Sequence, residues 1–185
     1  YSFCGLLRDV VDTAEYRQKY KWVMIDSLTE LSDLSFIHAD AGAKVGKSGE
    51  KNGFEVWESH ASNMIGACKY VRDMPLHVIV TALAKQQDDE NGNSHHWPML
   101  KGQQVQKQLP GIFDNVLCGV RVTENDGKVT RLIVTDEYKG WHGKVRDENR
   151  SLASVEREFD VTKLYRKMEQ SGKKEATAPA PASTT

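Results

Sequence analysis

One short segment of the chain combines a buried strand with a carboxylate at its end. Trp22 to Ile25 form an unbroken apolar run, and Asp26 follows it directly. Such a run is typical of a parallel strand, and open α/β sheets bind ligands at the carboxyl ends of their strands. A carboxylate there predicts a magnesium ion, held through water beside the phosphates of a nucleotide. The alternative interpretation is that Asp26 only caps the helix that follows.

A second apolar segment, Leu76–Leu83, also ends in polar side chains. Thr81 lies near its end, and Lys85 and Gln86 follow. If the two strands are neighbours, Thr81 or Gln86 could sense the terminal phosphate of a nucleotide and relay its loss to the next loop. The alternative is a strand that simply runs into a solvated loop.

Residues 41–48 almost spell the phosphate-binding pattern G-x-x-x-x-G-K-[ST], but Ala41 replaces the first glycine. That motif also needs a strand before it and a helix starting at its lysine, whereas this segment follows a predicted helix and runs into a polar stretch. We therefore reject it as a phosphate loop. It remains a flexible basic loop whose Lys44, Lys47 and Lys51 could contact a nucleic-acid backbone, or else a solvated surface loop.

Two cations, Lys144 and Arg146, stand on alternate residues after a predicted hairpin. In an extended segment both would project to one side. They could then reach the phosphates of a neighbouring subunit and stabilise the charge of a transition state. The alternative is an exposed ion-pair strand that includes Asp147 and Glu148.

The elements that position these residues are predicted from periodicity and turn signals. Apolar spacing predicts a helix over 5–20, one from Ser27 to about Phe36 with Glu30 at the capping-box position, and a long helix from Phe54 to Val71. Residues 85–96 are predicted to be a long polar loop.

The second half of the chain is predicted to contain a hairpin between helices. A short helix is expected over 102–109, and a turn at 124–127 joins strands 113–122 and 129–135. A last helix is expected over 161–168. Residues 176–185 contain only Ala, Pro, Ser and Thr, a composition that predicts disorder.

Composition excludes several classes of protein. The 185 residues are 39% apolar, which suits one sizeable core, and the net charge of −1 means that any basic surface must be local. Three cysteines without a C-x-x-C pair argue against a disulfide framework and favour a reducing compartment. No apolar run approaches the roughly 18 residues of a membrane span, so we expect a soluble, cytoplasmic protein.

Taken in order, these segments resemble the RecA-like ATPase domain of many phage recombination proteins, an AAA-type family that includes phage single-strand annealing ATPases. The resemblance covers roughly Leu6 to Met168 and implies that the strand ending in Asp26 is the Walker B strand. It rests on six segments: 23–31, 57–73, 77–81, 98–102, 109–114 and 144–147.

The resemblance implies an α/β fold, a RecA-like P-loop NTPase core with a mostly parallel central sheet and a C-terminal antiparallel hairpin. Residues 1–170 would form a partial core and residues 171–185 a disordered tail. The N-terminal strand and phosphate loop of the family are expected upstream of Tyr1. We therefore expect this chain alone to bind ATP weakly or not at all and not to hydrolyse it.

The resemblance also implies roles for particular residues. Asp26 would be the magnesium-side carboxylate with Ser27 as its neighbour, and Thr81 with Gln86 would form the sensor region for bound ATP. Lys144 and Arg146 would act in trans.

The implied partners are single-stranded DNA, further copies of the chain in a ring or filament, and a single-strand binding protein, in the cytoplasm of a bacterial host. Loops 39–52 and 85–97 would contact DNA, chiefly through Lys44, Lys47, Lys51 and Lys85. Two alternatives stay open: a non-catalytic DNA-binding or assembly subunit, and a relative of helicases or helicase loaders.

Overall fold

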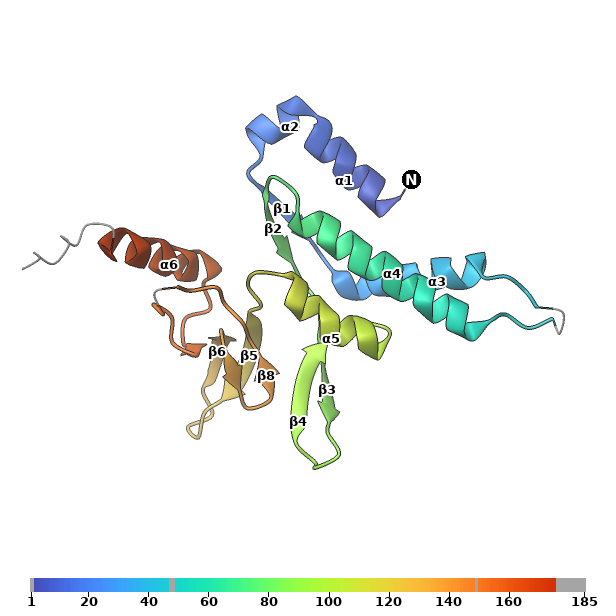
Figure 1. Ribbon diagram of the computed structural model, residues 1–185. Helices are drawn as coiled ribbons and strands as arrows, with labels where there is room; N and C mark the ends of the chain where they lie inside the picture. The colour runs from blue at the N-terminus through green and yellow to red at the C-terminus, as the bar shows by residue number, and fades with distance from the viewer. Residues whose placement is uncertain (1, 47–48, 149, 176–185) are drawn as a thin grey trace, which may run out of the picture. The chain divides into compact units, whose positions relative to one another are not determined.

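The computed structural model describes residues 2–46, 49–148 and 150–175, and within that range it is a mixed α/β protein (Figure 1). The chain divides into two compact units. The first runs to Gln87 and resumes over His96–Phe113, and the second comprises Asp88–His95 and the chain from Asp114 onward. The predicted α/β class is therefore confirmed.

The N-terminal helical segment is broken, contrary to the single helix predicted over 5–20. It consists of α1 (Phe3–Asp12), capped by Ser2, and α2 (Ala14–Lys19). Thr13 between them is extended, with φ −75° and ψ 106°, and its hydroxyl donates to the Asp9 carbonyl at 2.6 Å. This local hydrogen bond of a Thr side chain competes with the helical backbone pattern and ends the first helix.

Two parallel strands form the sheet of the first unit. They are β1 (Trp22–Ile25) and β2 (His77–Val80), paired so that Ile25 lies opposite Val80. One face packs on the cluster of Leu7, Val71 and Met74. The prediction of two covered strands therefore holds for one face, since the alternate side chains are exposed on the other: Trp22, Met24, His77 and Ile79.

Three helices build the main core of the first unit. They are α3 (Leu28–Gly42), α4 (Gly53–Arg72) and α5 (Gln103–Ile112), and α3 runs alongside α4 (Figure 1). The predicted long helix and the predicted short helix are confirmed, and α3 extends beyond its predicted end at Phe36. The buried cluster between the helices includes these residues: Leu28, Ala61, Met64, Cys68, Leu100, Val105 and Leu109.

The prediction of a loop over residues 85–96 is wrong. This segment is largely a hairpin of β3 (Ala84–Asp88) and β4 (Ser94–Pro98). Asp89 organises its turn, because its carboxylate accepts hydrogen bonds from the backbone N–H groups of Asn91 and Asn93 and from the Asn93 side chain. These bonds lower the pKa of Asp89 to about 2, the Asn93 side chain contributing most. The strands were missed because every side chain of β3 is exposed, so no apolar alternation marks it.

The second unit contains the predicted antiparallel hairpin, β5 (Cys118–Thr123) with β6 (Val129–Val134). A short third strand, β9 (Val155–Glu156), pairs with β6. A smaller hairpin joins β7 (Glu137–Tyr138) to β8 (Trp141–His142). Parallel pairing is thus seen in β1 and β2, whereas the strands of this unit pair antiparallel.

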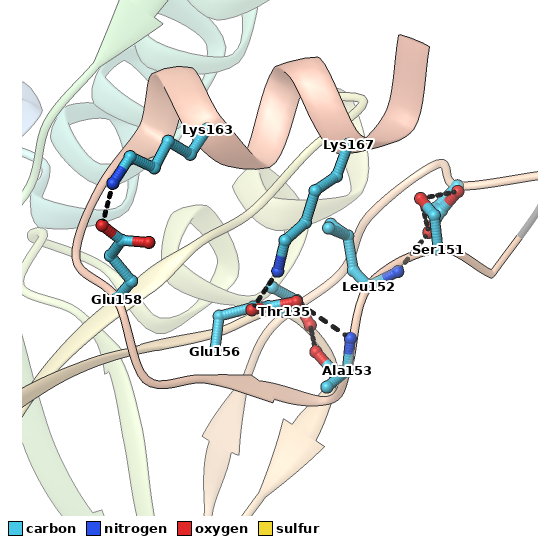
Figure 2. Close-up of polar contacts among 9 residues, drawn as sticks. Thr135, Ser151, Leu152, Ala153, Glu156, Glu158, Lys163 and Lys167 are labelled. Carbon is cyan, nitrogen blue, oxygen red and sulfur yellow. Dashed lines mark hydrogen bonds and ion pairs between the residues drawn. The ribbon is translucent and has the colours of Figure 1, made fainter. Parts of the chain in front are cut away.

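The last helix, α6 (Val161–Glu175), is longer than predicted and is tied to β9 by charge. Figure 2 shows Lys167 reaching from α6 to Glu156, a distance of 2.7 Å, while Lys163 pairs with Glu158. Burial opposes ionisation of Glu156, but hydrogen bonds from Lys167 and from the Ala153 backbone lower its pKa.

Of the predicted tail, 171–185, residues 171–175 belong to α6, contrary to the prediction, whereas 176–185 lie outside the described residues and their disorder stays a prediction. Among the described helices, none combines the length and the apolar character needed to cross a membrane.

Candidate functional site

The strand ends of β1 and β2 bring together two of the predicted site residues. Asp26 follows β1, Thr81 follows β2, and the Thr81 hydroxyl donates a hydrogen bond to Asp26 Oδ1. The parallel register accounts for this contact, because it places Ile25 opposite Val80, so the next residue of each strand emerges at the same edge. The sequence resemblance assigned both residues to the nucleotide site, but it did not predict that they would bond.

The start of α3 locks this edge in place. Ser27 is the N-cap, and its Oγ accepts from the Glu30 N–H at 3.5 Å, as the capping-box spacing predicted. The Leu28 N–H donates to the Thr81 carbonyl at 2.8 Å, and the Thr81 N–H donates to the Ile25 carbonyl at 3.0 Å. The strand end and the helix N-terminus therefore share one hydrogen-bond network around Asp26.

Side chains of α3 fasten the chain that follows β2. The hydroxyl oxygen of Thr29 accepts from the Leu83 N–H at 3.1 Å, and that of Ser32 accepts from the Lys101 N–H at 2.9 Å. Ser32 is 1% exposed. These bonds were not anticipated from the sequence, because a hydroxyl inside a helix gives no local sign of a partner more than 50 residues away.

His60 in α4 completes the buried polar contacts of this unit. Its side chain is fully buried, with Nδ1 3.1 Å from the Ser35 hydroxyl and Nε2 3.1 Å from the Lys101 carbonyl. Because a carbonyl only accepts, Nε2 carries the proton and Nδ1 accepts from Ser35. Burial lowers the pKa of His60 below 6.5, so a neutral imidazole joins α4, α3 and the segment before α5.

The edge suits a magnesium ion bound through water. Asp26 is exposed and, within the described residues, its carboxylate has the Thr81 hydroxyl as its hydrogen-bond partner, so Oδ2 faces no competing donor. Magnesium keeps several of its waters and needs one or two protein carboxylates. The described residues hold no group of three or more His, Cys, Asp or Glu side chains placed for a metal, the arrangement that an all-protein cage would require.

The other predicted site residues belong to other elements. Gln86, predicted for the nucleotide, and Lys85, predicted to contact DNA, are exposed in β3, which follows the edge that holds Asp26. Lys144 and Arg146 belong to the second unit. There the backbone of Lys144 pairs with Val116, and the Arg146 guanidinium is 2.9 Å from Asp114.

The predicted DNA-contact loop contains a paired cation. Lys51 Nζ lies 2.6 Å from Asp40 Oδ2, whereas Lys44 is exposed and Lys47 lies outside the described residues. Asp40 belongs to α3, which extends into the segment predicted as loop. The charge of Lys51 is therefore already balanced by a neighbouring carboxylate.

A family model described as an AAA domain matches residues 2–146, more than three quarters of the chain. The chain belongs to this AAA domain family. The matched region includes the β1–β2 edge with Asp26 and Thr81. The comparisons with curated proteins and with solved structures found no match. Membership indicates nucleotide-dependent activity of the P-loop NTPase type, and AAA domains generally bind ATP with a divalent metal.

Proposed function

We propose that this AAA domain is part of an ATP-dependent protein that acts on single-stranded DNA in phage recombination, repair or strand annealing. The observation that carries the nucleotide half of the proposal is the contact between Asp26 and Thr81 at the carboxyl ends of two parallel strands. Open α/β sheets bind ligands at this edge. The family match supports the same assignment.

In this proposal each residue of the edge has a distinct task. Asp26 would hold magnesium through water, and the metal would neutralise charge on the phosphates. Thr81 orients the carboxylate by donating to Oδ1, and we propose that it registers loss of the terminal phosphate. Gln86 belongs to the proposed sensor region, and Lys144 and Arg146 are proposed to act in trans on a neighbouring copy.

The phosphate loop of the proposed RecA-like core precedes the Asp26 strand in sequence. Within residues 2–148 the near-match at 41–48 does not supply it, because its first half belongs to α3 or the segment directly after that helix rather than following a strand. We therefore propose that a segment before residue 1 supplies the loop. Hydrolysis should then require a polypeptide that includes that segment.

ATP binding and hydrolysis, with and without single-stranded DNA, test this function. They are measured on the chain and on a version extended upstream, each beside its Asp26→Asn variant. Asp12→Asn, an exposed carboxylate at the end of α1, is the matched control. We expect DNA-stimulated turnover in the extended protein, its loss in Asp26→Asn, and no effect of the control.

Two outcomes would contradict the proposal in different ways. DNA binding without turnover in the extended protein would support a non-catalytic DNA-binding or assembly subunit. Turnover that DNA does not stimulate would remove the DNA half and leave a nucleotide hydrolase with another partner.

A further inference from the structure

The β5–β6 hairpin places two arginines directly opposite each other. Arg121 and Arg131 are register partners in the antiparallel ladder, so their side chains project from the same face. Both are exposed. Like charges at directly opposed positions destabilise a sheet, so this pair is a local cost that a bound anion would relieve.

Among the described side chains, none neutralises either guanidinium. Within the described residues, no ion pair or side-chain hydrogen bond involves Arg121 or Arg131. The acidic residue nearest along the hairpin, Glu124, accepts from the Thr130 hydroxyl at 2.8 Å and lies 3.8 Å from Arg157. Because Thr130 precedes Arg131 in β6, its side chain projects from the opposite face, and Glu124 is drawn to that face.

An aromatic ring lies on the arginine face of the same hairpin. Gly119 is two residues before Arg121, so a side chain at Gly119 would project from the arginine face. A Cβ atom placed there would lie 2.8 Å from the ring of Phe159, so that ring lies next to this position. Ile133, opposite Gly119, is 1% exposed, whereas Phe159 itself is 54% exposed. Phe159 therefore lies beside Gly119 on the arginine face, and more than half of its surface is open to solvent.

We propose that this face binds single-stranded nucleic acid, with Arg121 and Arg131 on backbone phosphates and Phe159 stacked on a base. Paired cations beside an exposed aromatic ring are the elements that single-strand binding surfaces combine. An acidic protein segment would use the arginines but has no planar base for Phe159. The surface is distinct from Lys44, Lys47, Lys51 and Lys85, and the inference rests on the proposed DNA-binding function, to which it adds a contact site.

The arginines should contribute through counterion release. Each phosphate contact with a single strand contributes about 0.7 to the slope of log affinity against log salt concentration. One such contact therefore makes binding roughly fivefold tighter at about 0.1 M salt than at about 1 M. Loss of both contacts should therefore weaken binding about 25-fold and lower the slope by about 1.4. Loss of the ring should weaken binding without changing the slope.

The test is fluorescence anisotropy of a labelled oligothymidylate titrated with the full chain over a range of salt concentrations. The variants are Arg121→Gln, Arg131→Gln, both together, the double Lys replacement, and Phe159→Leu. The matched control is Arg157→Gln, which removes the same charge at a different place. Arg157 directly follows β9, the strand that pairs with the other edge of β6, and it lies near Glu124. Circular dichroism of each variant checks folding.

We expect Arg121→Gln and Arg131→Gln each to weaken binding about fivefold, and Arg157→Gln to weaken it less than twofold. Replacement of both arginines by lysine should leave the salt slope unchanged. Equal losses for Arg157→Gln and the two arginines would overturn the site while leaving DNA binding in place. No binding by the unchanged protein would overturn both the site and the DNA half of the proposed function. Displacement by polyglutamate as effective as by unlabelled oligothymidylate would reassign the face to an acidic protein and overturn the inference.

Discussion

The bond between Thr81 and Asp26 can be measured without any nucleotide. Thr81→Val removes the hydroxyl donor and keeps the shape of the side chain, and Asp26→Ala removes the acceptor. A hydrogen bond to a charged group contributes about 1.5–3 kcal/mol, and exposure of Asp26 to water reduces that figure. We therefore expect a coupling energy of about 1 kcal/mol between the two changes.

The assay is a double-mutant cycle in urea, followed by circular dichroism. For a slope of about 2 kcal/mol per M, a loss of about 1 kcal/mol moves the unfolding midpoint by about 0.5 M. Thr81→Ser keeps the hydroxyl and is the control, so it should retain the coupling with Asp26. If the two substitutions are additive within about 0.3 kcal/mol, the side chains do not interact and the proposed edge loses its geometric basis.

Three further predictions concern buried polar groups of the first unit. Ser32→Ala should lower the free energy of unfolding by about 1–3 kcal/mol, because the Lys101 N–H loses its hydrogen-bond partner. Urea denaturation tests this, with Ser59→Ala at an exposed position as the control. The free energy of unfolding should fall as the pH drops below 6.5, because the unfolded His60 takes up a proton that the folded one resists; the fall should continue until the pH reaches the lowered pKa of the folded state. Unfolding of His60→Gln at several pH values should lack that part of the dependence. Burial raises the pKa of Cys68 to about 12 and its side chain is 1% exposed, so a thiol reagent should label it only under denaturing conditions, as mass spectrometry of the labelled peptides would show.

Local signals in the sequence predicted the elements around Asp26 well. The apolar run 22–25, the Ser27 cap and the long helix from Phe54 to Val71 depend on neighbours within a few residues, and all three are confirmed. The β5–β6 hairpin was likewise marked by its turn at 124–127. Such features are decided by backbone geometry and capping, which a single sequence displays directly.

Features that depend on distant partners were missed. The β3–β4 hairpin lacks the signal of apolar alternation because β3 is exposed throughout, and its turn depends on the hydrogen bonds of one side chain, Asp89. His60 has the same helical spacing whether it is buried or solvated, and only the Ser35 hydroxyl and the Lys101 carbonyl decide its state. The opposition of Arg121 to Arg131 likewise needs the exact number of residues in the turn.

The path of the chain between the two units limits how the protein can be divided. The polypeptide passes from one unit to the other after Gln87, after His95 and after Phe113. A gene cut at Phe113 would therefore separate residues 88–95 from the rest of their unit, including His142, whose ring stacks on that of His95. Neither unit is one continuous stretch of sequence, so neither can be exchanged on its own by a single crossover. We therefore expect recombination between related genes to keep the two units together.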